Sequence, residues 1–299
     1  MPINKGWSGD NKYRVTSEEG VDYLLRISPA SQYDRRKNEF MAMQRIAALG
    51  IAMSRPIAFS TCDDEVYSLQ SWIDGRDAEE LIPNLPRSKQ YAYGLEAGFI
   101  LRTIHSIPAP EECEKWSIRF NRKLDRKLKM YDDCLIKFEN DHVFIEYIRD
   151  NRHLIDPRPQ CCQHGDYHLG NMMIDGGGTL QIIDFDRLDY GDPWEEFNRI
   201  IFSSRVSPLF ATGLVDRYFD GHVPEDFWSL LALYIASNTL SSLPWAIPFG
   251  QDQIDTMLII ARETLEWYDK MRNPTPTWYV KQAHEEYLHC EHSSSDSSP

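Results

Sequence analysis

The 299-residue chain lacks several features that mark large classes of protein. Its 6 cysteines show no CxxC spacing, and Cys161 and Cys162 are adjacent, which suits neither a zinc knuckle nor a regular disulfide framework. The apolar runs are too short to cross a bilayer, and the N-terminal MPINKGWSGDNK has no apolar segment of the signal-peptide type. We therefore predict free thiols and a cytoplasmic location.

Positive charge is also scarce in this chain. It has 32 Lys and Arg residues against 46 Asp and Glu residues, which gives a formal net charge of −14. A nucleic acid partner is not expected, because phosphate backbones are bound by clustered Lys and Arg side chains. The acidic surplus either keeps the protein soluble or attracts a cationic small molecule into a cleft, and composition leaves both open.

Residues 1–72 have the pattern of a small β-rich lobe. NKYRVTSEEGVDYLLRIS alternates around an EEG turn, which predicts a β-hairpin. YDRRKNEFMAMQRIAALG places Phe40, Met43 and Ile46 at helical spacing before Gly50, which predicts a helix. IAMSRPIAFSTCDDEVYSLQSWIDG then predicts two more strands around a Cys-Asp-Asp turn. One helix is therefore expected among antiparallel strands.

From Asp74 onward helical periodicity dominates, so we expect the lobe boundary at WIDG. A larger, mainly helical lobe is predicted over residues 73–291, and the polar, low-complexity residues 292–299 are predicted to be disordered. The clearest helical segment is SKQYAYGLEAGFILRTIHSIP. Its apolar face is predicted to carry Leu95, Phe99, Ile100 and Ile104.

The most informative stretch is QHGDYHLGNMMI, which ends at Ile174 and is followed eight residues later by IIDFDRLDYGDP. A hairpin from Met172–Ile174 into GTLQIIDF would bring Asp166, Asn171 and Asp184 together. Two carboxylates and an amide make a poor apolar core but a good site for Mg²⁺, which takes oxygen ligands and keeps waters and substrate phosphates. Phosphoryl transfer uses such a set, with one Asp kept apart from the metal to accept the proton of the attacking hydroxyl.

HGDYHLGN resembles the H-G-D-x-x-x-x-N catalytic loop of the aminoglycoside phosphotransferase family, which is itself similar to the H-R-D-x-x-x-x-N loop of protein kinases. IDFD resembles the counterpart of D-F-G. The resemblance implies that Asp166 is the catalytic base, that Asn171 and Asp184 are metal ligands, and that His164 braces the loop. It implies an α+β, two-lobed, protein-kinase-like fold, with a small antiparallel β-rich N-lobe that binds nucleotide and a larger, mainly helical C-lobe.

The resemblance extends into the N-lobe. KGWSGDNKYRV lies where the family places its phosphate-covering loop. The family's strand Lys, which contacts the α- and β-phosphates, is an Arg in this sequence, and a Glu on the next helix is its candidate partner. YSLQSWIDG resembles the segment that joins the lobes and faces the nucleobase. These implied nucleotide-binding residues are Gly6, Ser8, Gly9, Arg26, Glu39, Gln70 and Trp72.

Two departures and one competing motif accompany this resemblance. Only five residues precede Gly6, so the first strand of the small lobe is expected to be short or missing, and Asp186 replaces the Gly of D-F-G. The spacing of His164 and His168 around Asp166 also allows a His/Asp zinc site of a metallohydrolase, although zinc hydrolases usually take several imidazoles and no second His cluster is present.

The resemblance implies a small-molecule kinase that uses Mg²⁺ with ATP or GTP and phosphorylates a hydroxyl group. The leading acceptor is an aminoglycoside-type antibiotic, while choline, homoserine, a sugar or a macrolide stays open. A nucleotide-binding pseudoenzyme is the alternative from another class, and the presence of Asp166, Asn171 and Asp184 argues against it. The oligomeric state cannot be read from the sequence.

Overall fold

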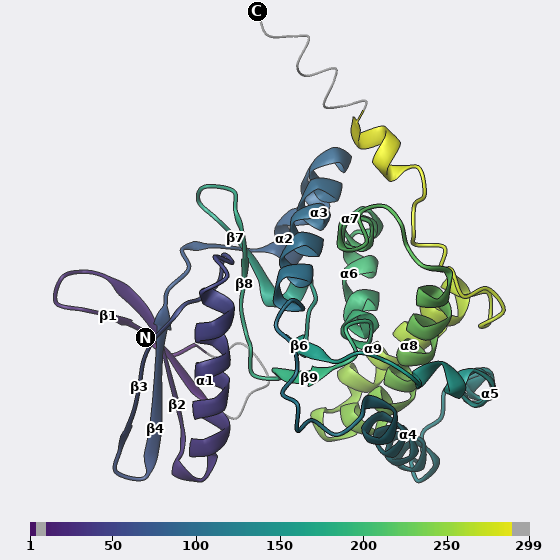
Figure 1. Cartoon of the computed structure of the whole chain (residues 1–299), viewed down its shortest axis with the longest axis horizontal. Helices are drawn as coiled ribbons and strands as arrows, with labels where there is room; N and C mark the ends of the chain where they lie inside the picture. The colour runs from purple at the N-terminus through teal and green to yellow at the C-terminus, as the bar shows by residue number, and fades with distance from the viewer. Residues whose placement is uncertain (4–9, 289–299) are drawn as a thin grey trace, which may run out of the picture. The chain divides into compact units, whose positions relative to one another are not determined.

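The structure is a computed structural model and describes residues 1–3 and 10–288 (Figure 1). The chain forms two compact units, and each contains two separate stretches of sequence. The first unit contains Met1–Asn84 and His164–Asp189, and the second contains Leu85–Gln163 and Tyr190–Pro299. The predicted tail at residues 292–299 lies outside the described residues.

A four-stranded antiparallel sheet dominates the first unit, and its strand order is β1-β2-β4-β3. The predicted hairpin and the predicted second strand pair are both confirmed. In Figure 1, helix α1 runs alongside this sheet, and its contacts fall on β3 and β4. These elements are β1 (Asn11–Thr16), β2 (Asp22–Pro29), η1 (Ala30–Gln32), α1 (Tyr33–Ala47), β3 (Pro56–Cys62) and β4 (Glu65–Ser71).

A second, three-stranded sheet explains why residues 164–189 belong to the first unit. Its order is β5-β7-β8, so β5 from the first stretch pairs with β7 from the second, and Met53 bridges to Ile182 as well. The unit boundary therefore falls after Asn84, later than the predicted residue 72, because strand pairing outweighs sequence proximity. The elements are β5 (Gly75–Asp77), α2 (Ala78–Leu81), η2 (Ile82–Asn84), η4 (Leu169–Asn171), β7 (Met172–Asp175) and β8 (Leu180–Ile182).

The second unit is mainly helical, as predicted. Helix α8 is its central element and packs against α4, α5 and α9. Two short strands, β6 and β9, pair with each other. The elements are α3 (Arg87–Ile104), α4 (Trp116–Asp132), α5 (Asp141–Asn151), η3 (Arg152–Ile155), β6 (Cys161–Gln163), β9 (Asp189–Gly191), η5 (Glu195–Arg199), α6 (Ile200–Val206), α7 (Pro208–Tyr218), α8 (Glu225–Ala246), η6 (Ile247–Phe249) and α9 (Gln251–Trp267).

Helix α8 and the turn after it correct one expectation. Within the described residues, the segment Glu225–Phe249 is long and apolar enough to cross a membrane, with a mean hydropathy of 1.3. From the sequence, the apolar runs were expected to be too short to cross a bilayer. The segment's most apolar part is 72% buried inside the structure, which is the burial of a core helix.

Helices α3 and α7 approach each other through glycines. A Cβ added to Gly94 would lie 2.2 Å from the Phe210 carbonyl oxygen, and one added to Gly213 would lie 2.4 Å from that of Tyr91. This approach rotates α3 away from the predicted orientation. Ile100 and Ile104 are buried as expected, but Phe99 is 53% exposed, because the glycine stripe rather than the bulkiest side chains sets the contact face.

Candidate active site

A cavity of about 510 Å³ lies within the first unit. The cavity is lined by Gln70, Ser71 and Trp72, at the end of β4 and just beyond it, by the predicted catalytic base Asp166 and by the predicted metal ligand Asn171. Asp184 lines the same cavity, so the fold gathers the three residues named for phosphoryl transfer and the segment named for the nucleobase. Gly6, Ser8 and Gly9 lie outside the described residues.

Gly165 lets the catalytic loop make its turn. Its φ of +86° lies in the left-handed region, and an added Cβ would lie 1.9 Å from the carbonyl oxygen of Arg187. Only glycine satisfies both conditions. The Gly of H-G-D therefore allows the loop to lie directly against the backbone that follows Asp184.

His164 contacts both the loop that carries Asp166 and the segment that follows β8. Its side chain is fully buried, and its Nε2 donates to the carbonyl oxygen of Ile183 at 3.0 Å while its Nδ1 accepts from the backbone N–H of Asp166 at 3.3 Å. The ring also packs on Phe185, with 4.6 Å between centroids. These contacts connect the loop that carries Asp166 to the segment Ile183–Phe185, and the bracing role of His164 stays a prediction.

Asn171 and Asp166 form the next layer of the site. The Asn171 Nδ2 donates to the backbone oxygen of Asp166 at 2.9 Å and to its Oδ2 at 3.3 Å. Since the amide nitrogen is used in this way, the amide oxygen of Asn171 stays available to a cation. Arg187 and His168 flank the same carboxylate, at 3.7 Å from Oδ1 and 3.8 Å from Oδ2.

Asp184 has the properties expected of a cation ligand. Its φ of 62° is unusual for a residue other than glycine, and its Oδ1 is buried without a hydrogen-bond partner among residues 1–3 and 10–288. The Arg26 Nη1 lies 3.6 Å from that oxygen. A buried carboxylate oxygen without a hydrogen bond carries a free-energy cost that a bound divalent cation would remove.

A zinc site finds no support in the geometry. Across residues 1–3 and 10–288, no group of three or more His, Cys, Asp and Glu side chains is placed to hold a metal ion. The His168 Nδ1 accepts from the backbone N–H of Gly170 at 3.1 Å, so this imidazole caps the short η4 helix. The donor set of Asn171 and Asp184 fits Mg²⁺ instead, which completes its shell with phosphates and water.

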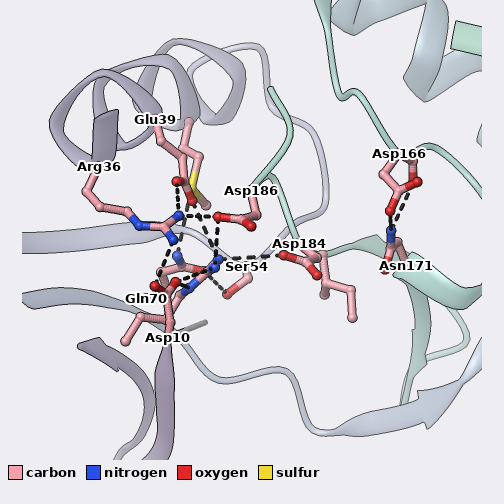
Figure 2. Close-up of polar contacts among 12 residues, drawn as sticks. Asp10, Arg36, Glu39, Ser54, Gln70, Asp166, Asn171, Asp184 and Asp186 are labelled. Atoms are coloured by element: carbon pink, nitrogen blue, oxygen red, sulfur yellow. Dashed lines mark hydrogen bonds and ion pairs between the residues drawn. The ribbon is translucent and has the colours of Figure 1, made fainter. Parts of the chain in front are cut away.

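A buried ionic cluster lies on the other side of Asp184 (Figure 2). The Arg26 Nη2 donates to the Asp10 Oδ2 at 2.8 Å, and its Nη1 lies 3.5 Å from the Glu39 Oε1, so the predicted pair of Arg26 and Glu39 is present. Arg36 binds three carboxylates at once, namely Asp10 at 2.7 Å, Glu39 at 2.6 Å and Asp186. Both arginine side chains are about 95% buried, since their exposed fractions are 5% and 6%.

The electrostatics of this cluster favour the charged forms of its arginines. Burial on its own would lower the pKa of Arg26, but the carboxylates of Glu39, Asp184, Asp10 and Asp186 outweigh it and raise the pKa. Burial likewise acts to raise the pKa of Asp186, and the hydrogen bond from Arg36 reverses this to a lowered pKa. Glu39 is the exception, because burial raises its pKa despite both arginines.

Sequence reasoning missed Asp10, Arg36 and the role of Asp186 in this cluster. Arg36 and Glu39 are three residues apart on α1, a spacing that places them on the same helix face, so their pairing could have been inferred. Asp10 gave no such signal, because its partners come from β2 and α1. Asp186, which replaces the Gly of D-F-G, is a binding partner of arginines in this structure.

Comparison with known proteins places the chain in a family. A model of the phosphotransferase enzyme family matches residues 1–228. The chain belongs to this family. It is thus a small-molecule kinase, and the motifs HGDYHLGN and IDFD both fall within the matched residues.

Individual relatives agree with this assignment. An aminoglycoside 3'-phosphotransferase of Niallia circulans is 25% identical over 217 residues, which are 69% of this chain and 79% of that protein. An amicoumacin kinase, solved in complex with AMP-PNP, Ca²⁺ and Ami, has a TM-score of 0.63 at 13% identity, and the match covers 92% of this chain and 90% of that protein. A choline/ethanolamine kinase family protein of Mesorhizobium loti has a TM-score of 0.64 at 16% identity and covers 96% and 92%. The predicted kinase-like α+β fold is confirmed.

Proposed function

We propose that this enzyme transfers the γ-phosphoryl group of Mg²⁺-bound ATP to a hydroxyl group of a small molecule, with an aminoglycoside-type antibiotic as the leading acceptor. The observation that carries the proposal is the single cavity shared by Asp166, Asn171, Asp184 and the Gln70–Trp72 segment. The amicoumacin kinase was solved with a nucleotide analogue, which supports ATP as the donor; GTP stays the alternative donor.

The nucleobase has an apolar place to bind in this cavity. Leu24 from β2 and Met173 and Ile183 near the catalytic loop line it, and such side chains suit the two faces of a purine. The backbone of Gln70–Trp72 would meet the edge of the base. Gln70 is itself buried, and its Oε1 accepts from the Ser54 hydroxyl at 3.2 Å, which holds this wall in place.

The reaction follows from the position of Asp166. Its carboxylate accepts the proton of the acceptor hydroxyl, the hydroxyl oxygen attacks the γ-phosphorus, and the bond from that phosphorus to the β–γ bridging oxygen breaks to leave ADP. The Asn171 amide orients Asp166 through its Nδ2. Asp184 and the Asn171 oxygen would hold Mg²⁺, which neutralises charge on the phosphates when bound.

The acceptor class rests on two observations. The Niallia circulans relative is named as an aminoglycoside kinase, and the net charge of −14 suits a polycationic substrate. The decisive experiment measures ADP release with ATP and with GTP over a panel of aminoglycosides, macrolides, choline, homoserine and sugars. Turnover confined to choline, or to a neutral acceptor, would overturn the aminoglycoside assignment but keep the phosphotransferase reaction.

A further inference from the structure

Arg26 occupies the strand position at which the family places its phosphate-binding Lys, yet its charge is already used. Its Nη2 binds Asp10 at 2.8 Å and lies 3.3 Å from Asp186, while its Nη1 lies 3.5 Å from Glu39 and 3.6 Å from Asp184. Its side chain is 5% exposed. A guanidinium held by four carboxylates can approach a triphosphate only if it leaves those carboxylates buried and unpaired, which is costly.

A second cation faces the same cavity from the neighbouring strand. Lys12 lies on β1 directly opposite Arg26 in the β1–β2 register, and directly opposed residues of an antiparallel pair project from the same face of the sheet. Lys12 and Arg26 both line the cavity, as do Leu24 and Gln70, which lie on this face by the same register. The sheet therefore presents Lys12 to the cavity in which the nucleotide is proposed to bind.

Unlike Arg26, Lys12 has no counter-ion within residues 1–3 and 10–288. Its ammonium forms no hydrogen bond or ion pair there, and its side chain is only partly buried. Like charges directly opposed across two strands are destabilising, so negative charge on this face of the sheet would stabilise the Lys12–Arg26 pair. The protein's own carboxylates satisfy Arg26, and an anionic ligand in the cavity would satisfy Lys12.

We propose that Lys12, and not Arg26, is the side chain that binds the phosphates of the nucleotide. Arg26 and Arg36 are then positioning residues. They fix Asp10, which lies two residues before Lys12 and immediately before β1. An ammonium on a flexible stem serves as a mobile point charge for phosphate oxygens, whereas the fork of Arg26 is committed to carboxylates. This inference rests on the proposed ATP-dependent reaction and assigns the cation within it.

Calorimetry on the full-length protein tests the proposal with AMP-PNP in the presence of MgCl₂ and with adenosine, which carries no phosphate. We expect Lys12→Met to weaken AMP-PNP binding about 10- to 100-fold, the value of one charged hydrogen bond, and to leave adenosine affinity unchanged. Lys12→Arg should recover part of the loss. Lys37→Met is the matched control, because Lys37 is an exposed lysine of the same unit outside the cavity.

Arg26→Met supplies the opposite signature. It should lower the denaturation midpoint, because Asp10 and Glu39 lose a buried partner, while Lys12→Met should leave the midpoint unchanged. Lys12→Met with AMP-PNP affinity within about twofold of wild type overturns the proposal. The proposal is also overturned if Arg26→Lys folds stably and loses affinity for AMP-PNP while Lys12→Met keeps it. A wild-type protein that binds no nucleotide overturns the proposed function as well, which separates the two failures.

Discussion

Two neighbouring regions of the first unit handle charge in opposite ways. In the ionic cluster, Arg26 and Arg36 are buried and each arginine binds several carboxylates. Around the catalytic loop, Asp184 keeps a buried oxygen that accepts no hydrogen bond from any residue that the structure describes, and the Arg187 and His168 nitrogens lie 3.7 and 3.8 Å from the Asp166 carboxylate. Figure 2 shows Asp184 between these two regions. In the ionic cluster, complete ion pairing stabilises the fold. Around the catalytic loop, incomplete pairing leaves carboxylate oxygens available to substrate and metal.

The largest effect is expected at Asp166. Asp166→Asn removes the proton acceptor and should lower turnover by ~10²–10⁴-fold, while the affinity for nucleotide stays unchanged because the triphosphate is bound by other residues. Steady-state ADP release and calorimetry measure the two quantities separately. Asp64→Asn, at an exposed carboxylate of the same unit, is the control. Wild-type turnover in Asp166→Asn would remove this residue from the mechanism.

The cluster is tested by Arg36→Met. The change leaves Asp10, Glu39 and Asp186 buried without this partner and should lower the free energy of unfolding by about 3–5 kcal/mol. Arg35→Met is the matched control, because the neighbouring Arg35 is 56% exposed and its pair with Asp186 should contribute at most about 1 kcal/mol. Urea denaturation gives both values. Equal effects from the two variants would contradict the difference between the regions.

Metal dependence tests the open region. Asp184→Ala should reduce Mg²⁺-dependent nucleotide affinity by about 10- to 100-fold, and Asn171→Ala should weaken it less and shift the optimal metal concentration. Titrating MgCl₂ at fixed AMP-PNP measures the effect, and EDTA should reduce the wild type to the level of Asp184→Ala. Stoichiometric zinc in the purified protein, together with phosphate-ester hydrolysis without nucleotide, would favour the metallohydrolase instead.

A lysine of the second unit sharpens the comparison, because it is crowded by like charge. Burial first, and then the charge of Lys123, lower the pKa of Lys127 from 10.5 to about 7, and Glu195 compensates only in part. Unfolding therefore takes up a proton between these two pKa values, so the wild type gains stability as pH rises through that window. Lys127→Met should be more stable than wild type at about pH 6, and this difference in stability should be smaller at about pH 9. Urea midpoints over pH measure this. A constant difference would show that packing dominates.

Much of the first unit could be predicted from its sequence, because local signals agree with the fold there. The alternation around the EEG turn gave the β1–β2 hairpin, and the H-G-D-x-x-x-x-N motif gave the cavity residues Asp166 and Asn171. In those segments each contact is made by residues close in sequence, so spacing alone is informative.

Features that depend on contacts between residues distant in the sequence could not be predicted. The lobe boundary was predicted at residue 72 and the compact units divide after Asn84, and nothing local to β5 indicates that its partner is β7. Phe99 was placed on the packed face of α3, although Gly94 and Gly98 decide which face meets α7. The commitment of Arg26 to Asp10 and Asp186 depends on three separate segments. Periodicity describes one helix or strand at a time, whereas these three features depend on contacts between two or more elements.

The division of the first unit into two stretches also has a consequence for biosynthesis. Strand β5 at Gly75–Asp77 pairs with β7 at Met172–Asp175, so a ribosome must add about 100 residues before that partner exists. At ~5–20 residues per second the wait is on the order of ten seconds, during which α3, α4 and α5 are translated. A nascent chain stalled before residue 164 can hold the sheet of β1 to β4 but has no catalytic loop. The last residue that lines the cavity, Arg187, is therefore translated after α3, α4 and α5 but before α6, α7, α8 and α9.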